Sequence, residues 1–305
     1  MIRLGRKYRK LYSIVLFLSF NFFSACDDEG IILDGASYVP KIVIEGYLYP
    51  GHFIDNIKIT RNMPFNEVID YETTILTDVK VKLTDLSSRK YYILSYNKTN
   101  STYWYESRDI KIDFNKIYKL EVWTAIDEKN LYAYSVTTTP AEGLKIEKNG
   151  TDTLCYREKD SANHLVKYKI KLYPSKGSEI IAVSITSEQP GVSTFIFDNP
   201  YLKIDSSDVK NDITRYSNQF FSLENYNPDA EELEINIDWP LIWFYGKYRV
   251  IVYAGDKNFK NFFLTQKDVQ EPDGNFHEPK LDITGDGIGV FASAVTDTTY
   301  FFVKR

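Results

Sequence analysis

Hydrophobic and polar residues alternate along short segments throughout the first half of the chain. Because successive side chains of a strand point to opposite faces, a period of two predicts half-buried β-strands. Turn-forming residues at 97–100 and 127–130 separate neighbouring segments, and no helical segment suited to a parallel crossover lies between them. The pattern therefore predicts an immunoglobulin-like β-sandwich over residues 41–140. The segments that carry it are 41–49 (KIVIEGYLY), 78–86 (DVKVKLTDL), 109–114, 117–124 and 131–138.

A break in this alternation at 139–143 (TPAEG) predicts a boundary between two domains, because proline and glycine interrupt regular strands. Asn149-Gly150 predicts a hairpin turn between 145–148 and 153–157, since both residues tolerate the positive φ of a type I′ turn. We therefore expect a second β-rich domain over residues 141–305. Its further strand-like segments are 165–173, 179–186, 231–237 and 247–254.

One helix is expected near the C-terminus, at about residues 257–270. Asp256 can cap its first turn, and Phe259, Phe262 and Phe263 recur at the spacing of one helix face. These phenylalanines are expected to pack against a sheet. Residues 206–230 are polar and irregular, which predicts a long loop with short elements. The predicted fold is mainly β: two β-sandwich domains, the first immunoglobulin-like, with one short helix.

The N-terminus has the pattern of a secretory signal. Five basic residues and no acidic one stand in the first ten positions, and a 13-residue apolar run at 11–23 (LYSIVLFLSFNFF) follows. A membrane-spanning helix needs about 20 apolar residues, so this run is too short to span a bilayer. Small residues, Ser24 and Ala25, then lead to Cys26. We interpret residues 1–25 as a signal peptide.

The exit of that segment resembles a bacterial lipobox, which implies that the thiol of Cys26 is lipidated and that cleavage occurs just before it. Residues 26–40 would then form a lipidated tether, since acyl chains anchor a protein through their buried methylene groups. The acidic run Asp27, Asp28 and Glu29 resembles the surface-export signal of Bacteroidota lipoproteins. The expected location is the outer membrane, exposed at the cell surface; a periplasm-facing lipoprotein is the alternative.

Charge and cysteine content narrow the function classes. Removing residues 1–25 removes five basic residues and no acidic one, which leaves 32 basic and 42 acidic residues and a net charge of −10. That balance argues against nucleic acid as a partner, because binding to phosphates requires basic clusters. Cys155 alone would remain besides the lipidated Cys26, so no intrachain disulfide is expected. We interpret Cys155 as a small hydrophobic residue; a nucleophile with His164 as base is the alternative.

Several segments taken together resemble a Bacteroidota envelope lipoprotein family catalogued as domain of unknown function 4249. The resemblance extends over nearly the whole chain after Cys26, with a departure at the Asp-rich turn 282–286. It implies no established activity, and it implies an association with TonB-dependent outer-membrane receptors, hence an accessory role in uptake. The segments are 41–48 (KIVIEGYL), 57–61 (IKITR), 79–85 (VKVKLTD), 118–122 (YKLEV), 258–270, 276–279 (FHEP) and 285–291 (GDGIGVF).

The chemistry-bearing residues favour a non-enzymatic binding protein. Asp282, Thr284 and Asp286 resemble half of a calcium loop, but the twelfth position is Ser293 and not the bidentate glutamate such a loop needs. No metal or cofactor is therefore expected. Aromatic side chains that could stack on a ligand are Trp104, Trp123, Trp239 and Trp243. The alternatives are a surface glycan-binding module that uses these rings, and an envelope polymer hydrolase that uses a carboxylate pair.

Overall fold

The computed structural model describes residues 38–305, apart from 65–66, 68–69, 149–151, 202, 224–225, 228 and 269–281. Pro40–Arg305 form one compact unit. The interpreted signal peptide, Ser24, Ala25, the lipidation residue Cys26 and the acidic run Asp27, Asp28 and Glu29 lie outside the described residues. Their roles stay predictions.

The first half of the unit is built from strands that follow the predicted alternation. The short helix α2 (Tyr71–Thr74) lies between β2 and β3. Asp127 and Glu128, at the tip of the β6–β7 hairpin, both adopt positive φ, as the two central residues of a type I′ turn do. Asn115 also adopts positive φ. The strands are β1 (Ile42–Leu48), β2 (Ile57–Arg61), β3 (Lys80–Asp85), β4 (Lys90–Asn97), β5 (Thr102–Trp104), β6 (Ile117–Ile126) and β7 (Lys129–Thr138).

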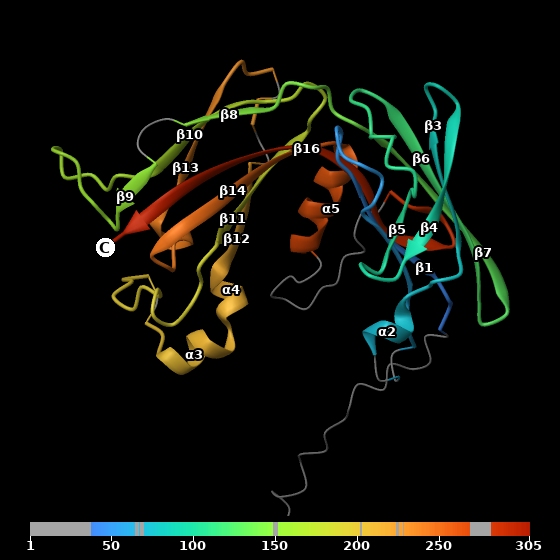
Figure 1. The fold of residues 1–305 in the computed structure, drawn as a ribbon, viewed down its shortest axis with the longest axis horizontal. Helices are drawn as coiled ribbons and strands as arrows, with labels where there is room; N and C mark the ends of the chain where they lie inside the picture. Colours follow the sequence, from blue (N-terminus) through green and yellow to red (C-terminus); the bar gives the residue numbers. More distant parts are fainter. Residues whose placement is uncertain are drawn as a thin grey trace, which may run out of the picture. The chain divides into compact units, whose positions relative to one another are not determined.

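The second half adds more strands and the remaining helices (Figure 1). Its strands are β8 (Lys145–Lys148), β9 (Thr153–Cys155), β10 (Tyr168–Tyr173), β11 (Ile180–Ser187), β12 (Asn218–Leu223), β13 (Leu233–Ile237), β14 (Gly246–Gly255), β15 (Thr284–Gly285) and β16 (Gly287–Lys304). Its helices are α3 (Ser206–Asn211), α4 (Ile213–Ser217), the 3₁₀ turn η2 (Trp239–Leu241) and α5 (Lys257–Asp268).

The long strand β16 connects the two halves (Figure 1). Its first residues, Gly287–Ser293, pair in parallel with β1, and Ala294–Val303 pair antiparallel with β14. One sheet therefore runs in the order β12-β11-β14-β16-β1-β2-β5-β4-β3-β6-β7-β15, and β13-β10-β8 form a separate sheet. The parallel pairing needs no crossover helix, because nearly the whole chain lies between β1 and β16.

Strands of the first half pack in two layers around one core. Ile42 and Ile44 of β1 and Ile57 of β2 are fully buried on one side, and Leu83 and Leu120 of β3 and β6 are fully buried on the other. Face-to-face packing of inward residues from two layers is the arrangement of a β-sandwich. The predicted mainly-β class is confirmed, and the immunoglobulin-like character of the first half stays a prediction. The described residues contain the short helices α2, α3 and α4 besides the one helix that was expected.

A second core lies between β10 and β13 and the sheet of β11, β14 and β16, and it contains Phe244 and Tyr248. A third, smaller cluster lies beneath α5, where Phe259 packs with Ile180 and Ala292. The start of the predicted helix and the packing of its phenylalanines are as expected; its predicted end at 270 lies outside the described residues. The division into two domains at residue 140 stays a prediction.

Two local expectations differ from the structure. The segments on either side of Asn149-Gly150 do not pair as a hairpin: β8 pairs with β10, and β9 pairs in parallel with β16. The polar stretch 206–230 contains α3, α4 and the edge strand β12. The strands β8, β9 and β12 pair with segments that are distant in the chain, so a local pattern did not indicate their partners.

Asp256 joins the two halves at the N-terminus of α5. Its Oδ1 accepts hydrogen bonds from the backbone N–H groups of Phe259 (3.0 Å) and Ser293 (3.2 Å). Its Oδ2 accepts from the hydroxyl of Thr137 (2.6 Å) and the N–H of Thr138 (3.4 Å). One buried carboxylate thus holds α5, β16 and β7 together.

Candidate functional site

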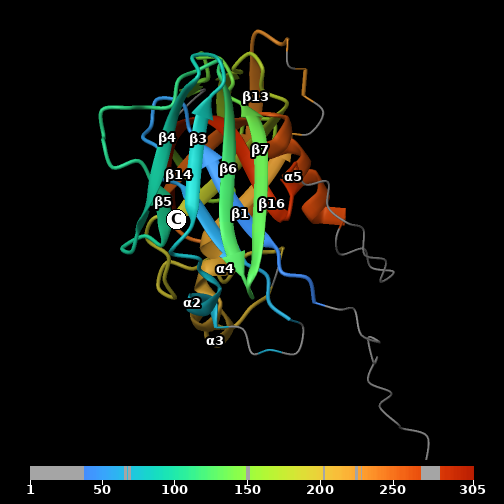
Figure 2. The same ribbon diagram turned by 90° about the vertical axis from the view of Figure 1, so that its right-hand side faces the viewer.

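The outward side of β4, β3, β6 and β7 carries an unusual concentration of aromatic and lysine side chains. Figure 2 shows these four strands side by side. Alternate residues along them are buried in the first-half core, so the others face solvent. Register places Lys80, Trp123 and Tyr132 in one row across the strands, and Lys82, Glu121 and Tyr134 in the next. We call this surface the aromatic–lysine face. Its members are Lys80, Lys82, Thr84, Tyr91, Ile93, Ile117, Lys119, Glu121, Trp123, Tyr132, Tyr134 and Val136.

Its aromatic rings contact one another and the lysines. The ring centroids of Trp123 and Tyr132 are 5.3 Å apart, and those of Tyr132 and Tyr134 are 5.8 Å apart with an angle of 30° between the ring planes. The Nζ of Lys80 lies 5.0 Å from the Trp123 ring centroid. The Nζ of Lys119 lies 4.5 Å from that of Tyr134. Cation–π attraction therefore acts on Trp123 and Tyr134, the two outer rings of the three, in addition to the contacts between the rings.

Glu121 lies at the centre of the face, and no other member of the face carries a carboxylate. Lys82 and Lys119 form ion pairs with it at 2.6 and 2.9 Å, and the hydroxyl of Tyr132 donates to it at 3.0 Å. Burial favours a higher pKa for Glu121, but these hydrogen bonds outweigh it and lower the pKa to about 2. Glu121 is thus ionised at neutral pH, and the face carries three lysines against one carboxylate.

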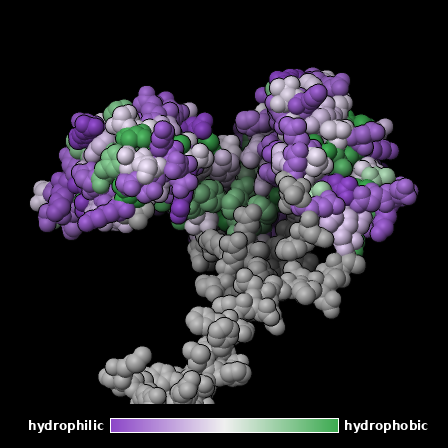
Figure 3. Space-filling view, turned by 90° about the horizontal axis from the view of Figure 1, so that it is seen from below, coloured by the Kyte–Doolittle hydropathy of each residue, from purple (hydrophilic) through white to green (hydrophobic). Residues whose placement is uncertain are grey.

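Large apolar side chains are exposed on the same face. Tyr91 is 65% exposed, and Ile93, Ile117 and Val136 are 40 to 46% exposed. In the view from below, hydrophilic residues cover most of the described surface, and apolar areas lie among them (Figure 3). The register places Lys82, Thr84 and Lys119 between the apolar residues of β4 and Val136 of β7, so apolar and basic side chains are interspersed across the face.

The four tryptophans that sequence reasoning singled out lie in different places. Trp123 is half-buried on the aromatic–lysine face. Trp104 on β5 is half-buried, and the guanidinium of Arg108 lies 5.4 Å from its ring centroid. Trp239 is buried in the second core, 3% exposed. Trp243 packs with Phe195 and Tyr216 at the edge of that core.

Tyr132 and Tyr134, which complete the face beside Trp123, were not among the sequence candidates. The alternation of Leu131, Tyr132, Ala133 and Tyr134 contains the necessary signal, because it places the tyrosines on the side opposite the buried leucine and alanine. What the sequence lacks is the pairing of this strand with Trp123.

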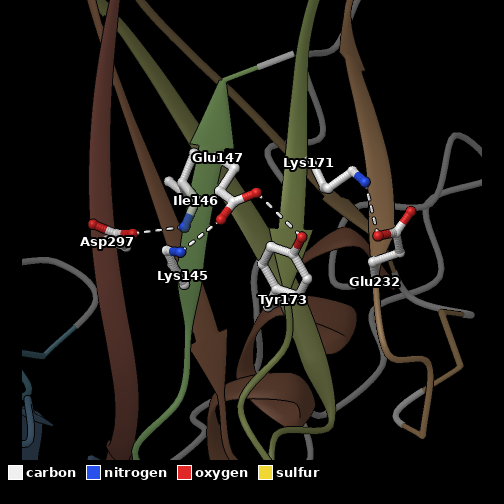
Figure 4. Close-up of polar contacts among 7 residues, drawn as sticks. All are labelled: Lys145, Ile146, Glu147, Lys171, Tyr173, Glu232 and Asp297. Carbon is white, nitrogen blue, oxygen red and sulfur yellow. Dashed lines mark hydrogen bonds and ion pairs between the residues drawn. The ribbon is translucent and has the colours of Figure 1, made fainter.

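The separate three-stranded sheet presents a different polar surface (Figure 4). Lys145 pairs with Glu147, which also accepts from the hydroxyl of Tyr173, and Lys171 pairs with Glu232. These pairs are exposed and balanced in charge, so water screens them and they select no ligand. Beside them, the carboxylate of Asp297 accepts the N–H of Ile146 at 2.7 Å and fixes β8 against β16.

The residues that resemble half a calcium loop have structural contacts instead. The carboxylate of Asp286 accepts the N–H of Tyr132, and Asp282 accepts from the side chain of Asn261. Across the part of the chain that the structure describes, no three His, Cys, Asp or Glu residues are grouped as a metal site would need. Within the same residues, no helix has the length and hydrophobicity to span a bilayer. Cys155 is partly exposed at the end of β9.

These features define a mainly-β protein with a solvent-facing aromatic and basic sheet. No protein-family model matches the chain, and no curated protein does. Among solved structures, it is similar to the interferon gamma receptor alpha chain of chicken, with 10% identity, 87% of this chain and 98% of that chain covered, and a TM-score of 0.22. It is also similar to a bacterial ice-binding adhesin, with 10% identity, 88% and 65% covered, and a TM-score of 0.22. Similarity at this level indicates nothing about function.

Proposed function

We propose that this protein is a lipid-anchored, non-enzymatic binding protein of the bacterial outer membrane, accessory to a TonB-dependent uptake system. The observation that carries the proposal is the order of features at the N-terminus: a basic start, an apolar run too short to span a bilayer, and Ser24-Ala25-Cys26. The resemblance to an envelope lipoprotein family supports the same conclusion. The acidic residues 27–29 favour exposure at the cell surface.

The aromatic–lysine face supports a binding role. Enzymes hold convergent polar groups in a concave site, whereas this face is a sheet surface whose single carboxylate is neutralised by two lysines. Exposed aromatic and aliphatic residues such as Tyr91 and Ile93 suit contact with another surface. A binding protein held at the membrane by its lipid would use such a surface.

The test of the anchor is metabolic labelling with a palmitate analogue in the native host. The unmodified chain should incorporate label and fractionate with membranes, and Cys26→Ala should lose both properties. Cys155→Ala is the matched control, because it removes the other cysteine and should keep label and location. Membrane retention of the Cys26→Ala chain would contradict the proposal, as would a mature N-terminus at any residue other than Cys26.

The accessory role has its own test. Purification of the acylated protein in mild detergent should recover a TonB-dependent receptor in a fixed ratio. Repeated recovery of the protein without any receptor would remove this part of the proposal and leave the anchor untouched.

A glycan-binding module is a second candidate, favoured by the surroundings of Trp104. Trp104 and Phe53 are both half-exposed, and the guanidinium of Arg108 lies 5.4 and 5.8 Å from their ring centroids. An aromatic ring can contact the apolar face of a sugar, and a guanidinium beside it can donate hydrogen bonds to the sugar hydroxyls. Calorimetric titration of surface oligosaccharides should then show binding that Trp104→Ala abolishes and Trp243→Phe preserves. Equal binding by both variants would exclude this site.

A further inference from the structure

We propose that the aromatic–lysine face is a membrane-docking surface, which lies on the anionic lipid surface of the bilayer that holds the anchor. This inference rests on the proposed function, because the anchor keeps the body close to that bilayer. It assigns the face one occupant: lipid headgroups and the upper part of the acyl region.

Charge is the first argument. The chain carries a net charge of −5, and −10 after removal of residues 1–25, so most of its surface is repelled by an anionic bilayer. The aromatic–lysine face is less acidic, because its members include three lysines and one carboxylate, Glu121. Asp282 and Asp286 of the edge segment around β15 lie beside β7, so the lysine charge is concentrated on β3 and β6. Each lysine near an anionic membrane strengthens binding by about fivefold. Attraction at this face and repulsion elsewhere would orient the body.

The side chains beside the lysines fit the membrane interface. Tyr91, Ile93 and Val136 are 65%, 46% and 40% exposed and can enter the headgroup region. Tryptophan and tyrosine are enriched at the interface because their rings are apolar and their edges polar. The ammonium group of Lys80 lies over the Trp123 ring, so the apolar stem of the lysine and the ring form one surface with its charge at the edge.

The ring contacts favour a bilayer over a sugar. Tyr132 lies between Trp123 and Tyr134, and lysine ammonium groups lie over the two outer rings. Their faces are therefore engaged within the protein, whereas stacking on a sugar requires a free face. Insertion into an interface requires only exposed edges and alkyl groups, which this face presents.

The anchor is attached where docking is geometrically possible. The compact unit begins at Pro40. Two residues later, Ile42 pairs with Arg61 in the β1–β2 register. Arg61 in turn forms an ion pair of 2.6 Å with Asp127, at the tip of the β6–β7 hairpin. The chain thus enters the unit next to the end of the face. The 14 residues from Cys26 to Pro40 span at most about 50 Å, which leaves the body free to lie on the membrane with this face down.

Spin-label accessibility tests the proposal on the full, acylated protein. In a Cys155→Ala background, Val136→Cys on the face and Tyr201→Cys, 45% exposed in the second half, each receive a nitroxide label. The protein is inserted into vesicles of phosphatidylcholine with or without phosphatidylglycerol, and flotation verifies insertion. At low salt, phosphatidylglycerol should lower the accessibility of the Val136 label to a water-soluble nickel complex severalfold. Accessibility at position 201 should not change, and high salt should restore it at position 136.

A charge-reversal pair supplies the matched control. Lys80→Glu removes a lysine that has no ion-pair partner among the described residues, and it should abolish protection of the Val136 label while flotation persists. Lys210→Glu makes the same charge change on the exposed surface of α3 and should leave protection intact.

The outcomes separate this inference from the proposed function. Vesicles that float with the protein, while the Val136 label stays as accessible as the Tyr201 label, would overturn docking and leave the anchor standing. Failure to float would overturn the anchor, and the docking inference would fall with it. Protection of Val136 in native membranes but not in the vesicles would mean that a protein occupies the face, which also overturns the proposal.

Discussion

Replacement of Asp256 by alanine should destabilise the protein strongly, because one buried carboxylate serves three elements. Asp256 is 4% exposed, and its carboxylate satisfies the Phe259 N–H of α5, the Ser293 N–H of β16 and the Thr137 hydroxyl of β7. In the alanine variant, these buried donors lose their acceptor, and α5 loses its N-cap.

The magnitude follows from these contacts. Loss of an N-cap costs about 1 kcal/mol. A buried N–H left without an acceptor costs about 1–3 kcal/mol. The Thr137 hydroxyl can turn to the Ser293 hydroxyl, 3.3 Å away, and so adds little. The expected loss in the free energy of unfolding is therefore about 2–4 kcal/mol.

The pH dependence of Asp256 has a definite sign. Burial raises the pKa of Asp256, and its four hydrogen bonds oppose the rise without reversing it. The folded protein thus holds the proton more tightly than the unfolded chain. Stability from this group is fully present below the unfolded pKa and falls as pH rises through the folded one. Asp256→Asn does not titrate, so its deficit relative to the unmodified protein should narrow as pH rises.

Urea denaturation followed by tryptophan fluorescence measures both effects. Asp205→Ala is the matched control, because Asp205 caps α3 with its side chain at the surface and should lose far less stability. A loss below about 1 kcal/mol for Asp256→Ala would refute the buried-donor argument. A deficit of Asp256→Asn that widens with rising pH would refute the sign.

Two other substitutions test the packing and the face. Gly289 has φ of +113°, and a side chain there would overlap the carbonyl of Ile44 across the β1–β16 pair; Gly289→Ala should lower the melting temperature well beyond Gly143→Ala, whose φ of +139° is also positive but whose surroundings are open. Glu121→Gln should lower the free energy of unfolding by about 1–2 kcal/mol at neutral pH. Because the ordinary pKa of 4.5 is lowered to about 2 in the folded protein, this deficit should disappear as pH falls towards 2 in chemical denaturation, and a deficit that is unchanged in acid would contradict it.

The sequence predicted individual strands far better than their partners. The β6–β7 hairpin could be read from alternation and from a turn at Asp127-Glu128, because all its information is local. β16 could not, since its middle is covered on both sides: Phe291 faces the first-half core, and Val290 and Ala292 face α5. A strand buried on both faces loses the period of two, so its length and its parallel pairing with β1 were not apparent.

The aromatic–lysine face likewise depends on strand pairing that the sequence does not indicate. Tyr132 and Tyr134 reach the side of Trp123 only because β7 pairs with β6 in one particular register, Trp123 opposite Tyr132. A slip of one residue would turn both tyrosines into the core and Ala133 to the surface. The buried Leu131 and Ala133 therefore determine the outward tyrosines, since their burial fixes which side of the strand faces solvent. The hydrophobic core thus sets the composition of the aromatic–lysine face, and a substitution that reverses the burial of these two residues would remove the face while leaving every tyrosine in the sequence.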